Sequence, residues 1–226
     1  MVISYCNEKG GCGKSTLSIL LSARLAEDGD DVLLIDADPQ KSINVFTENR
    51  SSQELPQIFS SISKTGNTLK DEIRSMQKKF DCLVIDTGGR DTIEMRQSFL
   101  VSNIVIIPVI PSAFDEEILK YMIEIFQKSR DYNEKLLGLV LPSKITTNPF
   151  LHSKEISDFK NTFEEVKKKT EVENLFLMDS YISDRKAYKD TIRNGKSLNE
   201  FGGVETAKEE FELFFKELIN FANKKN

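Results

Sequence analysis

The stretch Lys9-Gly10-Gly11-Cys12-Gly13-Lys14-Ser15-Thr16 decides the fold of this chain. It follows a short apolar run at 2–6 and opens an amphipathic stretch at 14–26, which predicts a strand, a glycine-rich loop and a helix in succession. Glycines let successive backbone N–H groups point inward and form an anion-binding concavity, and the helix N-terminus adds the positive end of its dipole. The stretch therefore predicts a phosphate-binding loop, in which Lys14 supplies a full positive charge and the Ser15 hydroxyl is placed to ligate Mg²⁺.

The rest of the chain alternates short apolar runs with helix-length amphipathic stretches. Continuous apolar runs predict strands buried on both faces, and they lie at 2–6, 32–36, 82–86, 104–107, 136–141 and 175–177. Helical patterns lie at 14–26, 91–101, 115–130, 152–169, 185–194 and 204–222, and the polar segment 52–79 is expected to be helical in pieces. This alternation predicts an α/β fold, a doubly wound and mainly parallel sheet with helices on both faces and ligands at the carboxyl ends of the strands.

Composition sets further bounds. A length of 226 residues without a low-complexity linker predicts a single domain over 1–226. The net charge of −5 means that any nucleic-acid binding must use a local basic patch. No run of about 18 apolar residues predicts a membrane span, and the N-terminus does not resemble a signal peptide. Three cysteines without paired spacing are expected to be reduced thiols in a cytoplasmic protein rather than disulfides or metal ligands.

The glycine loop departs from the general Walker spacing, because Glu8 stands where a glycine is expected and Lys9 adds a second lysine. In this it resembles the deviant Walker A motif of the ParA/MinD family of ATPases, most closely the short ParA-type plasmid and chromosome partition proteins. The resemblance implies ATP and Mg²⁺ as ligands and a face-to-face homodimer in the ATP-bound state. It also implies that Lys9 acts catalytically by reaching the partner's nucleotide, as an arginine finger does. The residues implied in phosphate binding are Lys9, Gly10, Gly11, Cys12, Gly13, Lys14, Ser15 and Thr16.

Two acids close the second apolar run, in the string Asp36-Ala37-Asp38-Pro39-Gln40. Acids two residues apart point the same way if the chain stays extended, and Pro39 then blocks continuation of the strand. Strand-end acids are often only helix caps, but this pair lies one strand–helix unit after the phosphate loop. The string resembles the family's Asp-x-Asp-Pro-Gln motif, which implies that Asp36 lies near the water shell of Mg²⁺ and that Asp38 positions or activates the attacking water.

A third acid closes the next apolar run, in Asp86-Thr87-Gly88-Gly89. An acid in this place is typical of a Walker B motif, so Asp86 is expected to hold Mg²⁺ through a water. Many family members have prolines just after this acid, whereas this chain has two glycines, and Gly88 or Gly89 is predicted to offer an N–H to the γ-phosphate. No histidine or cysteine constellation suits nucleophilic catalysis, so hydrolysis is expected to be slow and to rest on charge stabilisation and water positioning.

The stretch 184–196 contains five basic and two acidic residues in a protein that is acidic overall. Arg185, Lys189 and Arg193 recur at every fourth residue, which predicts one helix face. Such a stripe could contact DNA phosphates without sequence preference or could be an ordinary solvated face; the resemblance to ParA proteins favours DNA. The chain has no helix-turn-helix before the phosphate loop, so site-specific operator binding is not expected.

Two other segments bear on assembly and membranes. The segment Pro108–Asp115 resembles one that lies near the dimer or assembly surface in short ParA proteins, although a strand exit and a helix capped at Ser112 would explain it equally. The last helical pattern, 204–222, has an apolar side rich in phenylalanine and a mostly acidic polar side. Membrane-surface helices are normally basic there, so this helix is expected to pack on the sheet and no membrane partner is predicted.

The resemblance as a whole implies an ATP-dependent DNA segregation ATPase, located in the cytoplasm and associated with the nucleoid. Its ATP-bound dimer would hold nonspecific DNA, and a centromere-binding ParB-like adaptor would stimulate hydrolysis. Two alternatives remain open from the sequence, a MinD-like positioning ATPase on a membrane and a small ligase that phosphorylates a carboxylate on the same fold. Lys144, just past the fifth apolar run, is predicted to lie near the adenine base.

Overall fold

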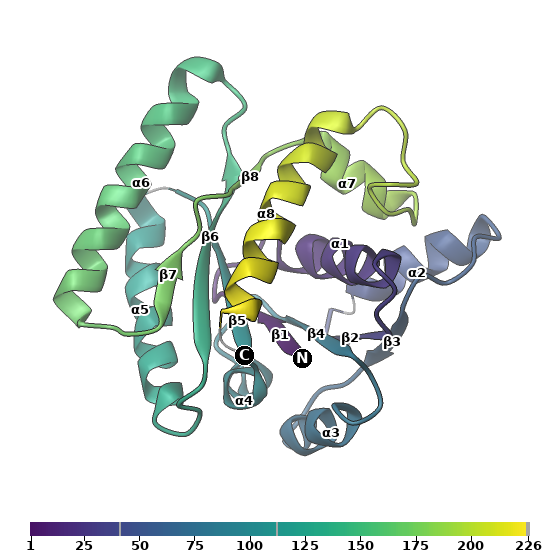
Figure 1. Cartoon of the computed structure of the whole chain (residues 1–226), viewed down its shortest axis with the longest axis horizontal. Coiled ribbons are helices and arrows are strands. Elements are labelled where there is room, and N and C mark those ends of the chain that lie inside the picture. Colours follow the sequence, from purple (N-terminus) through teal and green to yellow (C-terminus); the bar gives the residue numbers. More distant parts are fainter. Residues whose placement is uncertain (41, 112, 225–226) are drawn as a thin grey trace.

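The computed structural model describes residues 1–40, 42–111 and 113–224, and Figure 1 shows helices surrounding a central sheet. The strands are β1 (Val2–Tyr5), β2 (Val32–Ala37), β3 (Ser60–Ser63), β4 (Cys82–Thr87), β5 (Ile104–Val109), β6 (Leu137–Ile145), β7 (Leu175–Leu177) and β8 (Ile182–Ser183). The helices are α1 (Lys14–Glu27), α2 (Ser42–Ser52), α3 (Leu69–Met76), α4 (Ile93–Val101), α5 (Ala113–Arg130), α6 (Pro149–Thr170), α7 (Lys186–Arg193) and α8 (Glu205–Asn223).

The sheet has the strand order β3-β2-β4-β1-β5-β6-β7, and β8 pairs with β6 beyond the end of β7. All of these pairings are parallel. Strands β2, β3 and β4 lie on one side of β1 in the sheet, and the later strands β5, β6 and β7 lie on the other side. The predicted α/β class and doubly wound parallel sheet are confirmed, and the carboxyl end of β1 is a topological switch point where such folds bind ligands.

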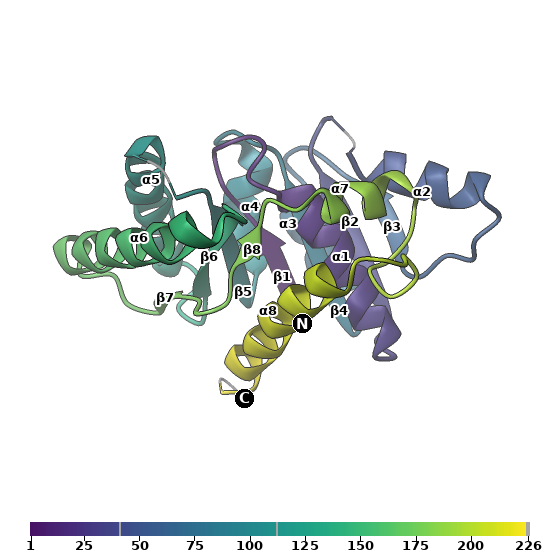
Figure 2. The same ribbon diagram turned by 90° about the horizontal axis from the view of Figure 1, so that it is seen from above.

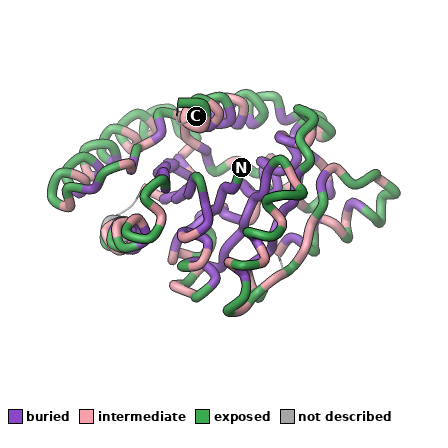
Figure 3. Tube along the Cα trace, turned by 60° about the horizontal axis from the view of Figure 1, so that its bottom comes forward, coloured by how far each residue is buried: buried purple, intermediate pink, exposed green. Residues whose placement is uncertain are grey.

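Alternate residues of the strands pack into cores on opposite faces of the sheet, which explains the continuous apolar runs. On β2, Leu34 belongs to the cluster that also contains buried residues of α1 and α8, whereas Leu33 and Ile35 belong to a cluster with residues of α3. On β5, Val105 faces a third cluster, built with α4, α5 and α6. Figures 1 and 2 accordingly place α1, α7 and α8 on one face of the sheet and α3, α4 and α5 on the other, and Figure 3 shows the buried backbone concentrated between them.

The C-terminal helix α8 packs on the sheet as predicted. Its apolar side is buried in the same core cluster as the inner residues of α1, through Phe211, Phe214, Phe215 and Leu218. Among the described residues, no helix combines the length and the apolar character that crossing a bilayer requires.

The segment between β2 and β4 differs from the prediction. Helix α3 lies within the expected helical pieces, but 60–63 forms the edge strand β3, which pairs with β2. Its sequence, Ser-Ser-Ile-Ser, is too polar to stand out, because an edge strand is only partly buried. Helix α2 ends at Ser52, the first residue of the segment that was expected to be helical in pieces, so neither α2 nor β8 was predicted. The predicted cap at Ser112 lies outside the described residues.

Gly138 on β6 provides a test of this packing. A Cβ there would lie 2.5 Å from Leu175 Cδ1 and 2.7 Å from Phe126 Cε2, so β7 and α5 leave no room for a side chain. We expect Gly138→Ala to lower the free energy of unfolding by about 1–3 kcal/mol through overpacking. Gly202→Ala is the matched control, since no atom lies within 4 Å of its Cβ position. Equal urea midpoints for the two variants would contradict this account of the core.

Candidate functional site

The glycine loop runs from the end of β1 to the start of α1 and has the backbone conformations of an anion-binding loop. Gly11 and Gly13 adopt positive φ values of 76° and 100°, where a side chain would be strained. Gly13 is also the N-cap of α1, so the loop leads directly into the positive end of a helix dipole. These conformations explain why the motif requires glycine at these positions.

Two buried side chains that the sequence analysis missed anchor this loop. The Asn7 amide donates to the Pro108 carbonyl at 2.7 Å, and its oxygen accepts from the Lys9 N–H at 2.9 Å. On the other side, the Ser143 hydroxyl donates to the Cys12 carbonyl at 2.6 Å. The loop is therefore tied to the ends of β5 and β6. A polar residue between an apolar run and a glycine loop was the available signal for Asn7, whereas nothing in the sequence marked Ser143.

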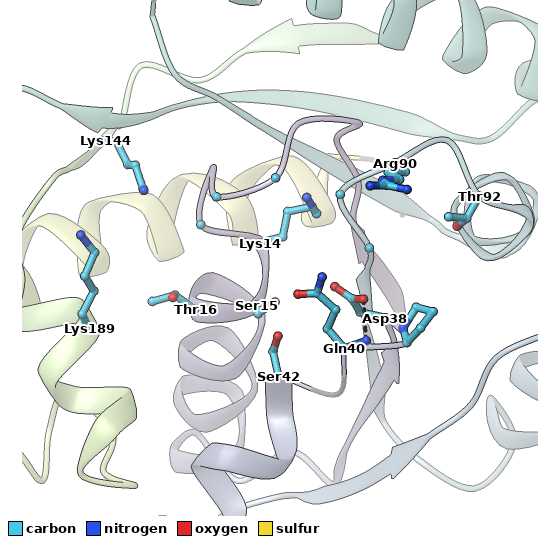
Figure 4. Close-up of a pocket in the computed structure, with 16 residues that line it drawn as sticks. Lys14, Ser15, Thr16, Asp38, Gln40, Ser42, Arg90, Thr92, Lys144 and Lys189 are labelled. Carbon is cyan, nitrogen blue, oxygen red and sulfur yellow. Dashed lines mark hydrogen bonds between the residues drawn. The ribbon is translucent and has the colours of Figure 1, made fainter.

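A cavity of about 750 Å³ opens above the loop at the carboxyl ends of the strands, as Figure 4 shows. Its lining contains most of the predicted nucleotide residues, namely Gly10, Gly11, Gly13, Lys14, Ser15, Thr16, Asp38, Gly88 and Lys144. It also contains Gly89, the predicted alternative to Gly88, and residues that were not predicted for it, namely Pro39, Gln40, Ser42, Arg90, Thr92 and Lys189. The sequence motifs therefore meet in one place, although the residues between and beyond them were missed.

Four predicted residues do not line this cavity, namely Lys9, Cys12, Asp36 and Asp86. The Lys9 carbonyl accepts a hydrogen bond from the Lys14 ammonium at 3.0 Å and another from the Cys12 thiol at 3.3 Å. Burial raises the pKa of this thiol, so Cys12 can contribute its backbone but not a thiolate. The role of Lys9 toward a partner's nucleotide stays a prediction.

Asp86 is a buried carboxyl group, and neither of its oxygens has a hydrogen-bond partner among the described residues. Burial raises its pKa to about 7, and the negative charges of Asp36 and Asp38 act in the same direction, while Ser15 and Lys14 oppose them. An orphaned carboxylate close to the Ser15 hydroxyl is suited to a hydrated Mg²⁺. Within the described chain no group of three acidic, histidine or cysteine side chains could hold a metal ion.

Asp36 and Asp38 differ in their surroundings. Asp36 is fully buried, and its two oxygens accept from the N–H groups of Asp38 and Ile43, both at 3.1 Å. It therefore shapes the turn and caps the start of α2. Asp38 is half-buried and lines the cavity, with one oxygen accepting from the Gln40 N–H at 2.9 Å. Of the two, Asp38 is the one placed to orient a water. The metal role of Asp36 and the catalytic role of Asp38 both stay predictions.

The basic stretch does not form the uniform helix face that its spacing predicted. Arg185 precedes α7 as its N-cap, and its guanidinium donates to the buried Glu210 carboxylate at 3.2 Å. Lys189 lines the cavity, pairs with Asp184 at 3.3 Å and points toward Lys144 in Figure 4. Arg193 is exposed and forms no ion pair with a described residue. The geometric expectation is therefore corrected, while the DNA role stays a prediction.

The electrostatic penalty at Asp86 predicts a pH-dependent effect of Asp86→Asn. Its folded-state pKa of about 7 exceeds the usual aspartate value of 3.8, so ionisation costs stability as the pH rises between these values. Without nucleotide, we expect Asp86→Asn to stabilise the protein at pH 8 by up to about 4 kcal/mol, and to do so progressively less toward pH 5. Thermal denaturation at both pH values measures this. If Asp86→Asn lowered the melting temperature equally at both pH values, burial would not disfavour the ionisation of Asp86.

Adding ATP and Mg²⁺ should reverse the order of stability at pH 8, because only the wild-type carboxylate attracts the cation. Ligand that binds the folded state raises the melting temperature by mass action. The expected result is a larger ligand-induced shift for wild type than for Asp86→Asn, whereas equal shifts would argue against a magnesium role for this residue.

Comparison with known proteins agrees with this geometry. The model of the CobQ/CobB/MinD/ParA nucleotide-binding domain matches residues 3–198. Protein ParA of Rhizobium radiobacter is 22% identical over 94% of this chain and 93% of its own length. The maintenance of carboxysome distribution protein A of Halothiobacillus neapolitanus is 31% identical over 59% of this chain and 62% of its own.

Solved structures show the same fold. Apo McdA from Cyanothece superposes with a TM-score of 0.76 at 20% identity, covering 96% of this chain and 98% of that one. A plasmid partition protein from Borrelia burgdorferi bound to AMPPNP superposes with a TM-score of 0.62 at 20% identity and the same coverage. The family model spans most of the chain and includes the loop, the acids and the cavity, and this chain therefore belongs to the CobQ/CobB/MinD/ParA nucleotide-binding family.

Proposed function

We propose that the protein is a ParA-type segregation ATPase, in which ATP binding controls a nonspecific grip on DNA. The observation that carries the proposal is that helix α7 contributes a residue to the lining of the cavity. Lys189 of α7 lines the same cavity as Lys14 and Ser15 of the glycine loop, while Arg193 of the same helix is exposed. A change of ligand in the cavity therefore acts directly beside the basic helix.

The cavity suits the triphosphate of ATP with Mg²⁺. The loop N–H groups, the α1 dipole and Lys14 would hold the phosphates, and Mg²⁺ bound by Ser15 and by Asp86 through water would supply further charge neutralisation. Asp38 would orient the attacking water, while Gly88 would donate its N–H to the terminal phosphate. Since no strong general base lies in this arrangement, the proposed hydrolysis to ADP and phosphate is slow. Lys144 and Lys189 would lie near the nucleoside part of the bound ATP.

The proposed cycle uses two copies of the chain. ATP would close a homodimer in which Lys9 of each copy reaches the other copy's nucleotide, and the dimer would present two α7 helices to the DNA backbone. A centromere-binding, ParB-like adaptor would then stimulate hydrolysis and release. Relatives with names that refer to partition, such as ParA, support this cycle, and it places the protein in the cytoplasm on the nucleoid.

A MinD-like membrane ATPase and a ligase are the two alternative functions. A MinD-like membrane role would need a free amphipathic helix, whereas α8 buries its phenylalanines against the sheet. A ligase has a structural precedent, because cobyrinic acid a,c-diamide synthase from Mycobacterium smegmatis superposes with a TM-score of 0.61 at 18% identity. A ligase would turn over steadily with a small carboxylic acid and without DNA, so ATPase assays with and without DNA separate the two.

DNA binding is tested on α7 with variants that spare the cavity. Lys189 is unsuitable because it lines the cavity. Lys186 and Arg193 are exposed and do not line it. We expect ATP-dependent binding to a random-sequence duplex that weakens steeply with salt, and a loss of about 10-fold or more in Lys186→Glu/Arg193→Glu, measured by fluorescence anisotropy. The control is Lys154→Glu/Lys168→Glu, which makes the same charge change on α6. Equal affinity of both double variants would exclude α7 as the DNA surface.

The two lysines of the loop should separate nucleotide binding from dimerisation. We expect Lys14→Ala to weaken ATP binding about 100-fold or more, because it removes the charge on the phosphates. Lys9→Ala should bind ATP within about threefold of wild type but fail to form the ATP-dependent dimer, because its proposed contact is in the partner. Calorimetry and light scattering measure the two properties. If Lys9→Ala still dimerises with ATP, Lys9 does not act across the interface.

A further inference from the structure

Arg90 is a cavity residue to which neither the motifs nor the proposed cycle gives a role. It lies in the loop between β4 and α4, two residues after Gly88, and it is exposed while lining the cavity. Figure 4 shows it on the opposite side of the cavity from Lys144 and Lys189, on the same side as Asp38 and Thr92. The cavity therefore has cationic side chains at both ends, with Lys14 between them.

The backbone that carries Arg90 is held against the phosphate loop. A Cβ on Gly89 would lie 2.8 Å from Gly10 Cα and 3.0 Å from Gly10 N, so these two backbones are in direct contact. A Cβ on Gly88 would lie 3.5 Å from the Asp38 carboxyl carbon. Gly89 thus permits a close approach that a larger residue would prevent, and the start of the Arg90 side chain lies beside the phosphate loop.

The guanidinium of Arg90 has no anionic partner among the described residues. The adjacent Asp91 is already occupied, because it accepts from Arg96 Nε at 2.8 Å and from the Tyr121 hydroxyl at 2.6 Å. No hydrogen bond or ion pair joins Arg90 to Asp38 either. Because Arg96 and Tyr121 bind the Asp91 carboxylate, the Arg90 guanidinium remains available for an anionic ligand in the cavity.

We propose that Arg90 binds the terminal phosphate of ATP and thereby distinguishes ATP from ADP. A planar guanidinium can give two parallel hydrogen bonds to phosphate oxygens. Lys14 at the start of α1 serves the phosphates nearer the loop, whereas Arg90 lies on the side of Asp38, where the attacked phosphorus would be. ADP has no phosphate there, so the contact exists only before hydrolysis.

This inference rests on the proposed function, since it assumes that ATP occupies the cavity. The test compares the affinities of Mg²⁺–AMPPNP and Mg²⁺–ADP for wild type, Arg90→Ala and Arg90→Lys, measured by calorimetry at concentrations where scattering shows a monomer. We expect Arg90→Ala to weaken AMPPNP binding about 10- to 100-fold and ADP binding less than about twofold. Arg90→Lys should fall between, because it keeps the charge without the fork.

The matched control is Arg74→Ala, which removes the same charge from an exposed position on α3 that does not line the cavity. It should leave both affinities unchanged. A second readout is trapping of ADP with beryllium fluoride, an analogue of the terminal phosphate, which Arg90→Ala should lose in the same proportion. Melting temperatures near wild type would confirm that the variants are folded.

The outcomes separate the two levels of the proposal. Failure of wild type to bind either nucleotide would overturn the proposed function itself. Normal wild-type binding with an unchanged AMPPNP-to-ADP ratio in Arg90→Ala would overturn only the role of Arg90. Loss of DNA binding at an unchanged ratio would reassign Arg90 to DNA, and a loss of nucleotide affinity confined to the dimer would reassign it to the partner's nucleotide.

Discussion

The structure of the site depends on the pairing of β2 with β4, which sets Asp36 directly opposite Asp86. Two buried carboxylates in adjacent parallel strands repel each other, and desolvation disfavours the charge of each. Asp36 offsets this cost with two backbone N–H groups, whereas Asp86 has no hydrogen-bond partner in the part of the chain that the structure describes. Without a ligand, the Asp86 carboxylate therefore lacks a compensating positive charge. The glycine loop, Lys14 and Ser15 are arranged around this carboxylate.

The same register connects the nucleotide end of the sheet to helix α7. Asp36 caps the start of α2, and near the end of α2 the buried Arg50 donates to the Gly195 carbonyl at 2.8 Å and to both oxygens of Glu200. A buried arginine is stable only when its donors are matched in this way. The Gly195 backbone also approaches Arg50 so closely that a Cβ would lie 2.3 Å from its nitrogen. Hydrogen bonds at both ends of α2 therefore connect Asp36 with the residues that follow α7.

The predictability of these features follows from how each is stabilised. The strands β1, β2, β4 and β5 could be predicted because burial on both faces requires continuous apolar runs. The edge strand β3 is half-solvated and polar, and α2 owes its start to Asp36, six residues upstream of Ser42, so neither produces a local signal. The phosphate loop was identifiable because its glycines and Lys14 have strict backbone and charge requirements.

Exposed charged residues obey no such requirement. Arg90 and Lys189 were missed as cavity residues because their roles depend on which strand ends meet, and spacing alone does not encode that. Arg185 was misplaced for a related reason: it lies just before α7 in an extended conformation, and the buried Glu210 on α8, which is distant in sequence, binds its guanidinium. Tertiary contacts decide where a side chain points at the end of a helix or strand. A basic helix face predicted from charge spacing alone is therefore larger than the one that forms.

The position of Lys189 constrains how ATP could favour DNA binding. A bound triphosphate brings negative charge to the cavity beside α7, and unlike charges within about 10 Å are only partly screened at physiological salt. In a single copy of a protein with net charge −5, the nucleotide would therefore weaken the attraction of α7 for DNA. An increase in affinity with ATP cannot then come from the field of the monomer. In the proposed cycle it would come from two α7 helices held together on one duplex, where linking the two contacts raises the apparent affinity without any new interaction in either.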